Sequence, residues 1–178
     1  MSMGPLKLST LINEEKITTR IKEIGAELTD KFRGKDVVAI SVLNGSFMFF
    51  ADLVREIETD IACEFLGVSS YGAATKSSGQ VKVTLDMSTD LSNKHVIIVE
   101  DIIDSGLTMN YMQHMINLRS PESITTVTLL HKPGAKKVGC DIDHIGFEIP
   151  NDFVVGYGLD YNGLYRNLPY IAQVQNIN

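Results

Sequence analysis

The chain has few cysteines and no long apolar run, and each shortage excludes a class of protein. Two cysteines among 178 residues cannot form the disulfide framework of a small secreted domain. We therefore expect Cys63 and Cys140 to pack as small apolar side chains. No apolar run approaches the roughly 18–20 residues of a membrane span. No N-terminal signal pattern is visible either, so we expect a cytoplasmic protein without membrane association.

A surplus of positive charge is also lacking. The formal net charge is −6, whereas a general nucleic-acid binder is usually basic. A local phosphate site is still compatible with this charge, because backbone amides and a few cations suffice to build one. Internal repeats, low-complexity tracts and linkers are absent from the sequence. The length suits a single domain, and 44% hydrophobic residues are ample for its core.

Buried strands alternate with helices in the hydrophobic pattern. Isoleucines spaced three and four apart predict an amphipathic helix over residues 14–32, with Asn13 as its N-cap and Gly34 at its C-terminal stop. Ser46 is a candidate cap for a second helix, and a third is expected over residues 107–119, with Leu118 on its apolar face. Strands are expected at residues 37–43, 61–68, 80–86, 96–99, 124–130, 143–148 and 170–174. This alternation predicts an α/β domain with a mainly parallel central sheet flanked by helices.

The turns that follow these strands should meet at one edge of the sheet. Right-handed crossovers bring together the turns at residues 44–46, 69–72, 100–108 and 132–134. Ligands of open α/β sheets bind beyond the carboxyl ends of the strands. The sequence therefore predicts a ligand site at this edge.

The stretch from His95 to Thr108 carries most of the chemistry. A β-branched run leads to three carboxylates, Glu100, Asp101 and Asp104, and then to a small polar turn that opens a helix. The carboxylates can accept hydrogen bonds from a diol, and one of them can serve as a base. Amides at the start of the helix can bind a phosphate. Periodicity alone thus predicts an acidic, phosphate-binding site without naming a reaction.

Residues 99–108, VEDIIDSGLT, resemble the phosphoribosyl-pyrophosphate (PRPP) binding motif of the type I phosphoribosyltransferases. Residues 146–150, GFEIP, and 154–161, VVGYGLDY, resemble the hypoxanthine-guanine branch of that family, and the resemblance extends over roughly residues 9–175. It implies the type I phosphoribosyltransferase fold in a single domain over residues 1–178. The core would lie at about 35–140, a small hood at about 1–12 and 141–178, and a flexible lid loop at about 69–84.

The same resemblance implies a purine salvage enzyme of bacterial type. Such an enzyme transfers the 5-phosphoribosyl group of PRPP to N9 of hypoxanthine or guanine, which gives IMP or GMP and pyrophosphate. The family uses Mg²⁺ and forms homodimers or homotetramers. The expected partners are therefore PRPP, hypoxanthine, guanine and a second copy of the chain, with no nucleic acid and no membrane.

Roles for individual residues also follow from the resemblance. Asp104 is implied as the catalytic proton acceptor or the partner of purine N7. The residues implied for PRPP are Asn44, Gly45, Ser70, Tyr71, Glu100, Asp101, Asp104, Ser105, Gly106, Leu107, Thr108 and Arg166. Those implied for the purine are Lys132, Phe153, Val154 and Asp160, and those for the metal are Glu100, Asp101 and Asp160.

One position departs from the family pattern. The turn that contacts pyrophosphate usually carries a lysine and contains a cis peptide, whereas this chain has Asn44. The departure removes a positive charge but leaves the backbone role of the turn possible. A lid that excludes water would begin with Ser70 and Tyr71, which match the Ser-Tyr pair of the family.

Three alternatives come from other functional classes. A regulator of the same fold that binds PRPP without catalysis would be expected to lack Asp104, Lys132 or the lid, and all three are present in the sequence. A phospho-receiver domain would place its acidic pair near the N-terminus, not in the middle of the chain. A nucleotide-binding dehydrogenase would need a GxGxxG motif before a helix, and the glycines at residues 156–163 lack that order.

Overall fold

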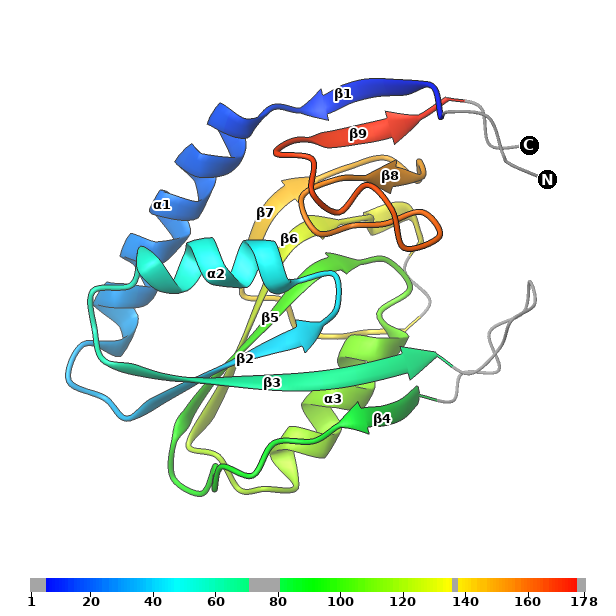
Figure 1. The fold of residues 1–178 in the computed structure, drawn as a ribbon. Helices are drawn as coiled ribbons and strands as arrows, with labels where there is room; N and C mark the ends of the chain where they lie inside the picture. The colour runs from blue at the N-terminus through cyan, green and yellow to red at the C-terminus, as the bar shows by residue number, and fades with distance from the viewer. Residues whose placement is uncertain (1–5, 71–80, 136–137, 176–178) are drawn as a thin grey trace.

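The computed structural model describes residues 6–70, 81–135 and 138–175. Within these residues, six strands form a large sheet in the order β4-β3-β2-β5-β6-β7, and three form a small sheet in the order β1-β9-β8 (Figure 1). The helices are α1 (Glu14–Phe32), α2 (Phe47–Arg55) and α3 (Leu107–Asn117), with a short 3-10 turn η1 (Pro133–Ala135). The strands are β1 (Leu8–Ile12), β2 (Val37–Leu43), β3 (Ile61–Ser70), β4 (Val81–Leu85), β5 (His95–Ile103), β6 (Ser123–His131), β7 (His144–Glu148), β8 (Val154–Val155) and β9 (Ile171–Val174).

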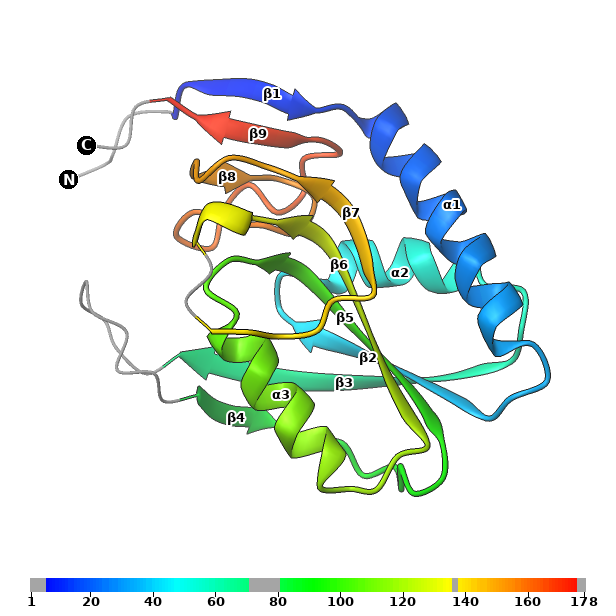
Figure 2. The same ribbon diagram turned by 180° about the vertical axis from the view of Figure 1, so that it is seen from behind.

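The predicted α/β class with a mainly parallel sheet is confirmed. Strands β3, β2, β5, β6 and β7 run parallel, and β4 pairs antiparallel with β3 at one edge. Helices α1 and α2 cover one face of the large sheet, and α3 covers the other (Figures 1 and 2). Because β2, β3, β5 and β6 are parallel, the segments that follow them all begin at the same edge.

Helix α1 begins and ends where the sequence predicts. The Asn13 side chain accepts a hydrogen bond from the backbone N–H of Lys16 at 3.0 Å, which satisfies one of the free amides of the first turn. Gly34 has a φ of 72°, a left-handed conformation that favours glycine after a helix. At Gly25 the helix approaches Glu56, where a Cβ would lie 2.6 Å from the Glu56 Cβ. The small residue thus lets α1 lie directly against the end of α2.

Two details of the helices differ from the prediction. Leu118 lies beyond the end of α3 and is 72% exposed, so it does not join the apolar face formed by Met109, Met112 and Ile116. Ser46 precedes α2 but makes no side-chain cap, because its hydroxyl donates to the carbonyl oxygen of Val42 at 2.5 Å instead. Within the described residues, no helix is both long and apolar enough to cross a membrane.

The small sheet is built from both ends of the chain. β1 pairs antiparallel with β9, which in turn pairs with β8. Ile12, Val154 and Ile171 of these strands share one buried cluster with α1 and α2, so the small sheet is continuous with the core. The predicted hood range from residue 141 includes β7, which pairs with β6 in the large sheet instead. We therefore use the name hood for the small sheet and residues 149–170.

The predicted lid loop is shorter than expected at both ends. β3 extends to Ser70 and β4 begins at Val81, so strands occupy positions at each end of the predicted range of 69–84. The remaining positions, 71–80, lie outside the described residues.

Candidate active site

The turn after β2 lies against the end of β5. Its Leu43–Asn44 peptide is cis. A Cβ placed on Gly45 would overlap the carboxylate of Asp101, so any larger residue here would force that carboxylate to move. The buried Ser46 hydroxyl lies 2.8 Å from the Ser41 hydroxyl and donates to Val42, which ties the turn to β2. This turn therefore has a fixed backbone in contact with a carboxylate.

Glu100 and Asp101 lie in the second half of β5, which continues to Ile103 rather than ending at Val99 as predicted. The Asp101 carboxylate is buried and accepts a hydrogen bond from the backbone N–H of Ile102 at 2.9 Å. Burial raises the pKa of Asp101 to about 6, although backbone N–H groups and the Arg166 charge oppose this effect. The negative charge of Asp160 raises it further. A carboxylate held in this way gains from a cation beside it.

Glu100 has unused hydrogen-bonding capacity. Its Oε2 atom is buried and has no hydrogen-bond partner in the part of the chain that the structure describes. Burial, and then the neighbouring Asp101 charge, raise the pKa of Glu100 well above its usual range. Buried carboxylate oxygens without partners fit a hard cation such as Mg²⁺, or the hydroxyls of a diol.

The described residues contain no group of three or more His, Cys, Asp or Glu side chains that could hold a metal ion by themselves. Mg²⁺ is commonly bound by one or two carboxylates together with substrate phosphates and water. Glu100 and Asp101 fit that kind of site, in which the substrate supplies the remaining ligands.

Asp104 to Thr108 form the predicted turn and the first residues of α3. The Asp104 carboxylate is exposed and accepts a hydrogen bond from the backbone N–H of Ser105. Gly106, with a φ of 77°, precedes the helix, and a Cβ there would lie 2.5 Å from the Val138 carbonyl oxygen. The Val138 N–H donates to the Ser105 carbonyl at 3.1 Å. The turn therefore presents helix N-terminal amides next to an exposed carboxylate, an arrangement suited to a phosphate and a proton acceptor.

Lys132 follows β6 and lies next to the end of β5. Its backbone N–H donates to the Ile103 carbonyl at 2.9 Å, and the residue is only 9% exposed. Phe153 is 45% exposed and meets the ring of Tyr161 edge to face at 5.7 Å between centroids. Val154 is buried at the start of β8. An ammonium group and an open aromatic face are thus available for a planar heterocycle with an oxo group.

Arg166 and Asp160 form an ion pair in the hood. The Nη2 atom of Arg166 lies 2.6 Å from Asp160 Oδ1, and Nη1 donates to the Gly158 carbonyl at 2.5 Å. A Cβ on Gly158 would overlap the carbonyl oxygen of Gly45, so the hood touches the turn after β2. The structure therefore brings the Asn44–Gly45 turn, Asp101 and Arg166 into one neighbourhood from distant parts of the sequence.

Two expected site residues are not placed. Ser70 ends β3, but its side chain is not described, and Tyr71 lies outside the described residues. Cys63 is exposed on β3, contrary to the expectation that it would be packed. Sequence reasoning also missed Gly158, Tyr157 and Asp52 as neighbours of the site. The glycines near residue 158 were visible in the sequence, but no pattern links them to Gly45.

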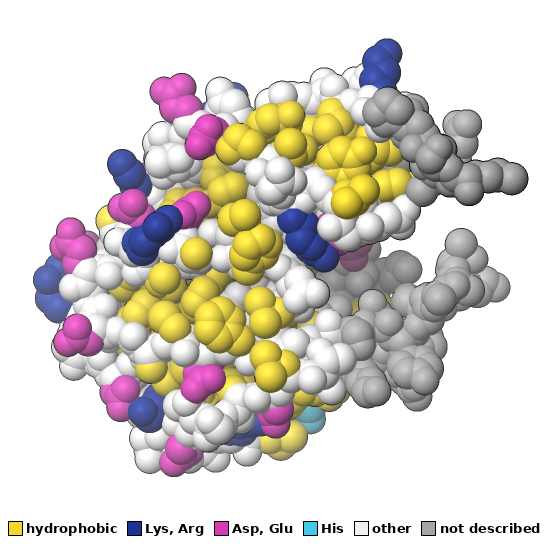
Figure 3. All heavy atoms as spheres, in the orientation of Figure 1, with side chains coloured by type: hydrophobic (Ala, Val, Ile, Leu, Met, Phe, Trp, Pro, Cys, Tyr) yellow, Lys and Arg dark blue, Asp and Glu magenta, His cyan; other side chains and the backbone are white. Residues whose placement is uncertain are grey.

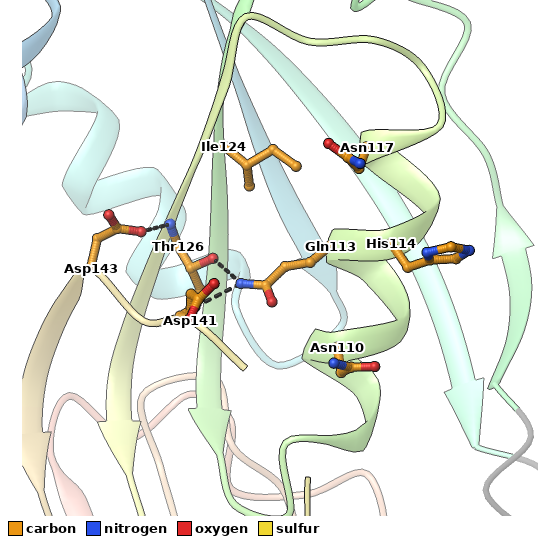
Figure 4. A pocket seen from close by; sticks show the side chains of 8 residues that line it. All are labelled: Asn110, Gln113, His114, Asn117, Ile124, Thr126, Asp141 and Asp143. Carbon is orange, nitrogen blue, oxygen red and sulfur yellow. Dashed lines mark hydrogen bonds between the residues drawn. The ribbon is translucent and has the colours of Figure 1, made fainter. Parts of the chain in front are cut away.

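A pocket of about 400 Å³ lies elsewhere, between α3 and the first half of β6 (Figure 4). Gln113 points across it and donates to the Thr126 hydroxyl at 2.7 Å and the Asp141 carbonyl at 2.6 Å. None of the predicted site residues lines it. Its central amide already has protein partners, so the edge of the sheet remains the candidate site.

Known proteins resemble this chain over most of its length. The family model of the phosphoribosyl transferase domain matches residues 8–162. The hypoxanthine-guanine phosphoribosyltransferase of Bacillus subtilis is 49% identical over 162 residues, which cover 91% of this chain and 90% of that protein. The hypoxanthine phosphoribosyltransferase of Haemophilus influenzae is 44% identical over 170 residues, covering 94% and 95%. A crystal structure of a hypoxanthine phosphoribosyltransferase from Staphylococcus aureus superposes with a TM-score of 0.91 at 42% identity, covering 96% of this chain and 92% of that one.

Proposed function

Since the chain belongs to the phosphoribosyltransferase family, in its hypoxanthine-guanine branch, we propose that it transfers the phosphoribosyl group of PRPP to N9 of hypoxanthine and guanine. The observation that carries this proposal is the convergence of the Asn44–Gly45 turn, Asp101 and Arg166 beside the Asp104–Thr108 turn. These groups match the two ends of PRPP, a pyrophosphate and a 5′-phosphate. The non-catalytic alternative has no observation in its favour.

The binding of PRPP is assigned along the edge of the large sheet. The amides of residues 105–108, with the Ser105 and Thr108 hydroxyls, hold the 5′-phosphate at the start of α3. Glu100 and Asp101 accept hydrogen bonds from the ribose hydroxyls, directly or through a cation. Arg166 and the backbone of the Asn44–Gly45 turn bind the pyrophosphate. A guanidinium is suited to this role because its planar donors fit phosphate oxygens.

Glu100 and Asp101 would hold Mg²⁺ together with PRPP, and Asp160 would hold a second Mg²⁺. When bound, the cation neutralises charge on the departing pyrophosphate. Asp160 is paired with Arg166 at 2.6 Å, so the charges of these two groups offset each other. Ser70 and Tyr71 belong to the proposed lid.

The transfer itself forms the N9–C1′ bond and breaks the bond from C1′ to the pyrophosphate oxygen. Asp104 takes the proton that the purine loses, or hydrogen-bonds to N7 during the step. Lys132 donates to O6 of the base, which favours 6-oxopurines because adenine presents an amino group there. Phe153 stacks on the ring, and the backbone of Val154 contacts its edge.

We also propose that the chain forms a homodimer or homotetramer through the open face of β3 and β4. Figure 3 shows hydrophobic side chains gathered on this side of the molecule, over α2 and β3. Phe65 is 44% exposed and Leu85 is 48% exposed, and exposed Cys63 lies on the same stretch of β3. Phe65 also meets the ring of Phe50 of α2 at 5.6 Å, so the face is continuous with the helix. Apolar area of this kind is stabilised when a second copy covers it.

An ultraviolet assay tests the proposed reaction. The protein is mixed with PRPP, Mg²⁺ and hypoxanthine, guanine, xanthine or adenine in turn. We expect nucleotide from hypoxanthine and guanine and none from adenine. A folded protein that binds PRPP by calorimetry but forms no nucleotide with any base would instead be a regulator of the same fold.

A further inference from the structure

Tyr157 of the hood is hydrogen-bonded to Asp52 of α2, although 105 positions separate them. The tyrosine is only 8% exposed, and its hydroxyl donates to Asp52 Oδ2. Burial and the Asp52 carboxylate raise the pKa of Tyr157, so the hydroxyl keeps its proton and stays the donor. Asp52 also pairs with Arg55 on the same helix. A hydrogen bond to a charged acceptor is stronger than one between neutral groups.

The backbone around Tyr157 is held in one tight conformation. Tyr157 has a φ of 50° and Gly158 a φ of 98°, both in the left-handed region. The N–H of Tyr157 donates to the Leu168 carbonyl at 2.9 Å, and that of Gly158 to the Arg166 carbonyl at 2.9 Å. These hydrogen bonds join the turn to the segment of residues 166–168, and Tyr157 attaches both to α2.

A direct line of contacts leads from this turn to the candidate site. Gly158 touches the carbonyl oxygen of Gly45, and the other side of Gly45 touches the Asp101 carboxylate. Arg166 donates to the Gly158 carbonyl at 2.5 Å. A shift of the turn away from α2 would therefore displace Arg166 and remove the contact between Gly158 and the Gly45 carbonyl oxygen.

We propose that Tyr157 and Asp52 are positioning residues that clamp the hood turn to α2 and so hold Gly45 and Arg166 in place for pyrophosphate. The clamp rests on the proposed function, because it assumes that these two groups bind the pyrophosphate of PRPP. The clamp should affect the pyrophosphate end of the site and not the purine end. The backbone N–H of Lys132 donates to Ile103 of β5, and the Phe153 carbonyl accepts from the N–H of Val174. The proposed purine contacts therefore have supports of their own.

Steady-state kinetics of Tyr157→Phe test the clamp, because the variant removes only the hydroxyl. We expect the KM for PRPP and the inhibition constant of pyrophosphate to rise about three- to tenfold. This rise is smaller than the full contribution of a hydrogen bond to a charged group, because the clamp acts on binding only through Gly45 and Arg166. The KM for hypoxanthine should stay within about twofold. Asp52→Ala should give the same pattern, and the double variant should be no worse than either single one. Asp52→Asn should recover part of the loss, since its amide oxygen can still accept from Tyr157.

Asp30→Ala is the matched control. Asp30 of α1 pairs with Arg33 three residues later, as Asp52 of α2 pairs with Arg55, but the Asp30 side chain is 81% exposed. It should leave both KM values unchanged. Thermal unfolding of each variant checks that it is folded. If Tyr157→Phe does not fold, the KM values of Asp52→Ala and Asp52→Asn test the clamp instead.

An unchanged KM for PRPP in folded Tyr157→Phe and Asp52→Ala would overturn the clamp. Equal rises in the KM for PRPP and for hypoxanthine would overturn it too, because they would indicate a general loosening. These results leave the proposed function intact as long as the unaltered protein forms nucleotide. Absence of nucleotide with the unaltered protein would instead refute the proposed function.

Discussion

At the residue scale, Asp104 differs from the other two carboxylates of its stretch. It is exposed at the end of β5, whereas Asp101 is buried against Gly45 and Glu100 has a buried oxygen. An exposed carboxylate can approach the base, while buried ones are suited to the sugar and a cation. The short sequence VEDIIDSGLT thus contains two environments, because Glu100 and Asp101 lie inside β5 whereas Asp104 lies in the turn after the strand ends at Ile103.

Asp104→Asn should therefore reduce turnover far more than it weakens PRPP binding. We expect kcat to fall by about 10²–10⁴-fold, the usual contribution of proton transfer to a positioned group. The dissociation constant of PRPP, measured by calorimetry, should change by less than about threefold, because the variant keeps the shape of the side chain. Equal losses in kcat and in PRPP affinity would contradict the role of Asp104 as a base.

The buried position of Asp101 predicts a pH dependence of stability. Its pKa of about 6 exceeds the ordinary value of 3.8, so the folded chain binds more protons than the unfolded chain between these pH values. The contribution of this carboxyl to the free energy of unfolding is therefore full below about pH 4 and is lost as the pH rises through about 6. Above that pH, Asp101→Asn should be more stable than the unaltered protein by up to about 3 kcal/mol, at about 1.4 kcal/mol per pKa unit.

Chemical unfolding without PRPP or Mg²⁺ at several pH values between 4 and 7 measures this difference. The advantage of Asp101→Asn should grow with pH across the interval. A difference that is constant over the interval would show that Asp101 does not titrate there.

At the scale of elements, α1 is the helix whose bounds the sequence predicts best. Its N-cap bond from Asn13 to the N–H of Lys16 and its left-handed Gly34 are local features. By contrast, α3 ends earlier than its apolar pattern suggested, and Ser46 bonds back to β2 instead of capping α2. In the case of Ser46 a carbonyl from another element competes with the local interaction, which the sequence does not reveal.

Asn13→Ala should lower the free energy of unfolding by about 1 kcal/mol, because one amide of the first turn of α1 loses its acceptor. Asn13→Asp is the matched control, since its carboxylate can still accept from the N–H of Lys16. Urea unfolding measures both variants. A loss in Asn13→Asp as large as that in Asn13→Ala would show that the cap contributes nothing.

At the scale of the whole molecule, the face formed by Phe65, Leu85 and Cys63 predicts self-association. Leu85→Glu should shift the protein towards monomer, because a charge would be buried where two copies meet. Leu118→Glu is the control, since Leu118 is 72% exposed and directly follows α3, which covers the opposite face of the sheet (Figure 2). Sedimentation velocity at micromolar concentrations measures both. An unaltered protein that is monomeric at tens of micromolar would contradict the proposed interface.

The sequence by itself determined the fold class, the mainly parallel sheet with its turns at one edge, and the chemical groups of the candidate site. These follow from hydrophobic period, from caps and turns, and from the motif at residues 99–108, all of which act within a few neighbouring residues. Family resemblance then supplied the reaction, which periodicity could not name.

Only the tertiary structure decided which distant groups touch. The contacts of Gly45 with Asp101 and Gly158, and the bond between Tyr157 and Asp52, join segments that are 56 to 113 positions apart. The membership of β7 in the large sheet and the exposure of Cys63 were likewise settled by strand order. Such contacts depend on how whole elements pack. The spacing of hydrophobic residues indicates whether a segment is a helix or a strand, but not which other element packs against it.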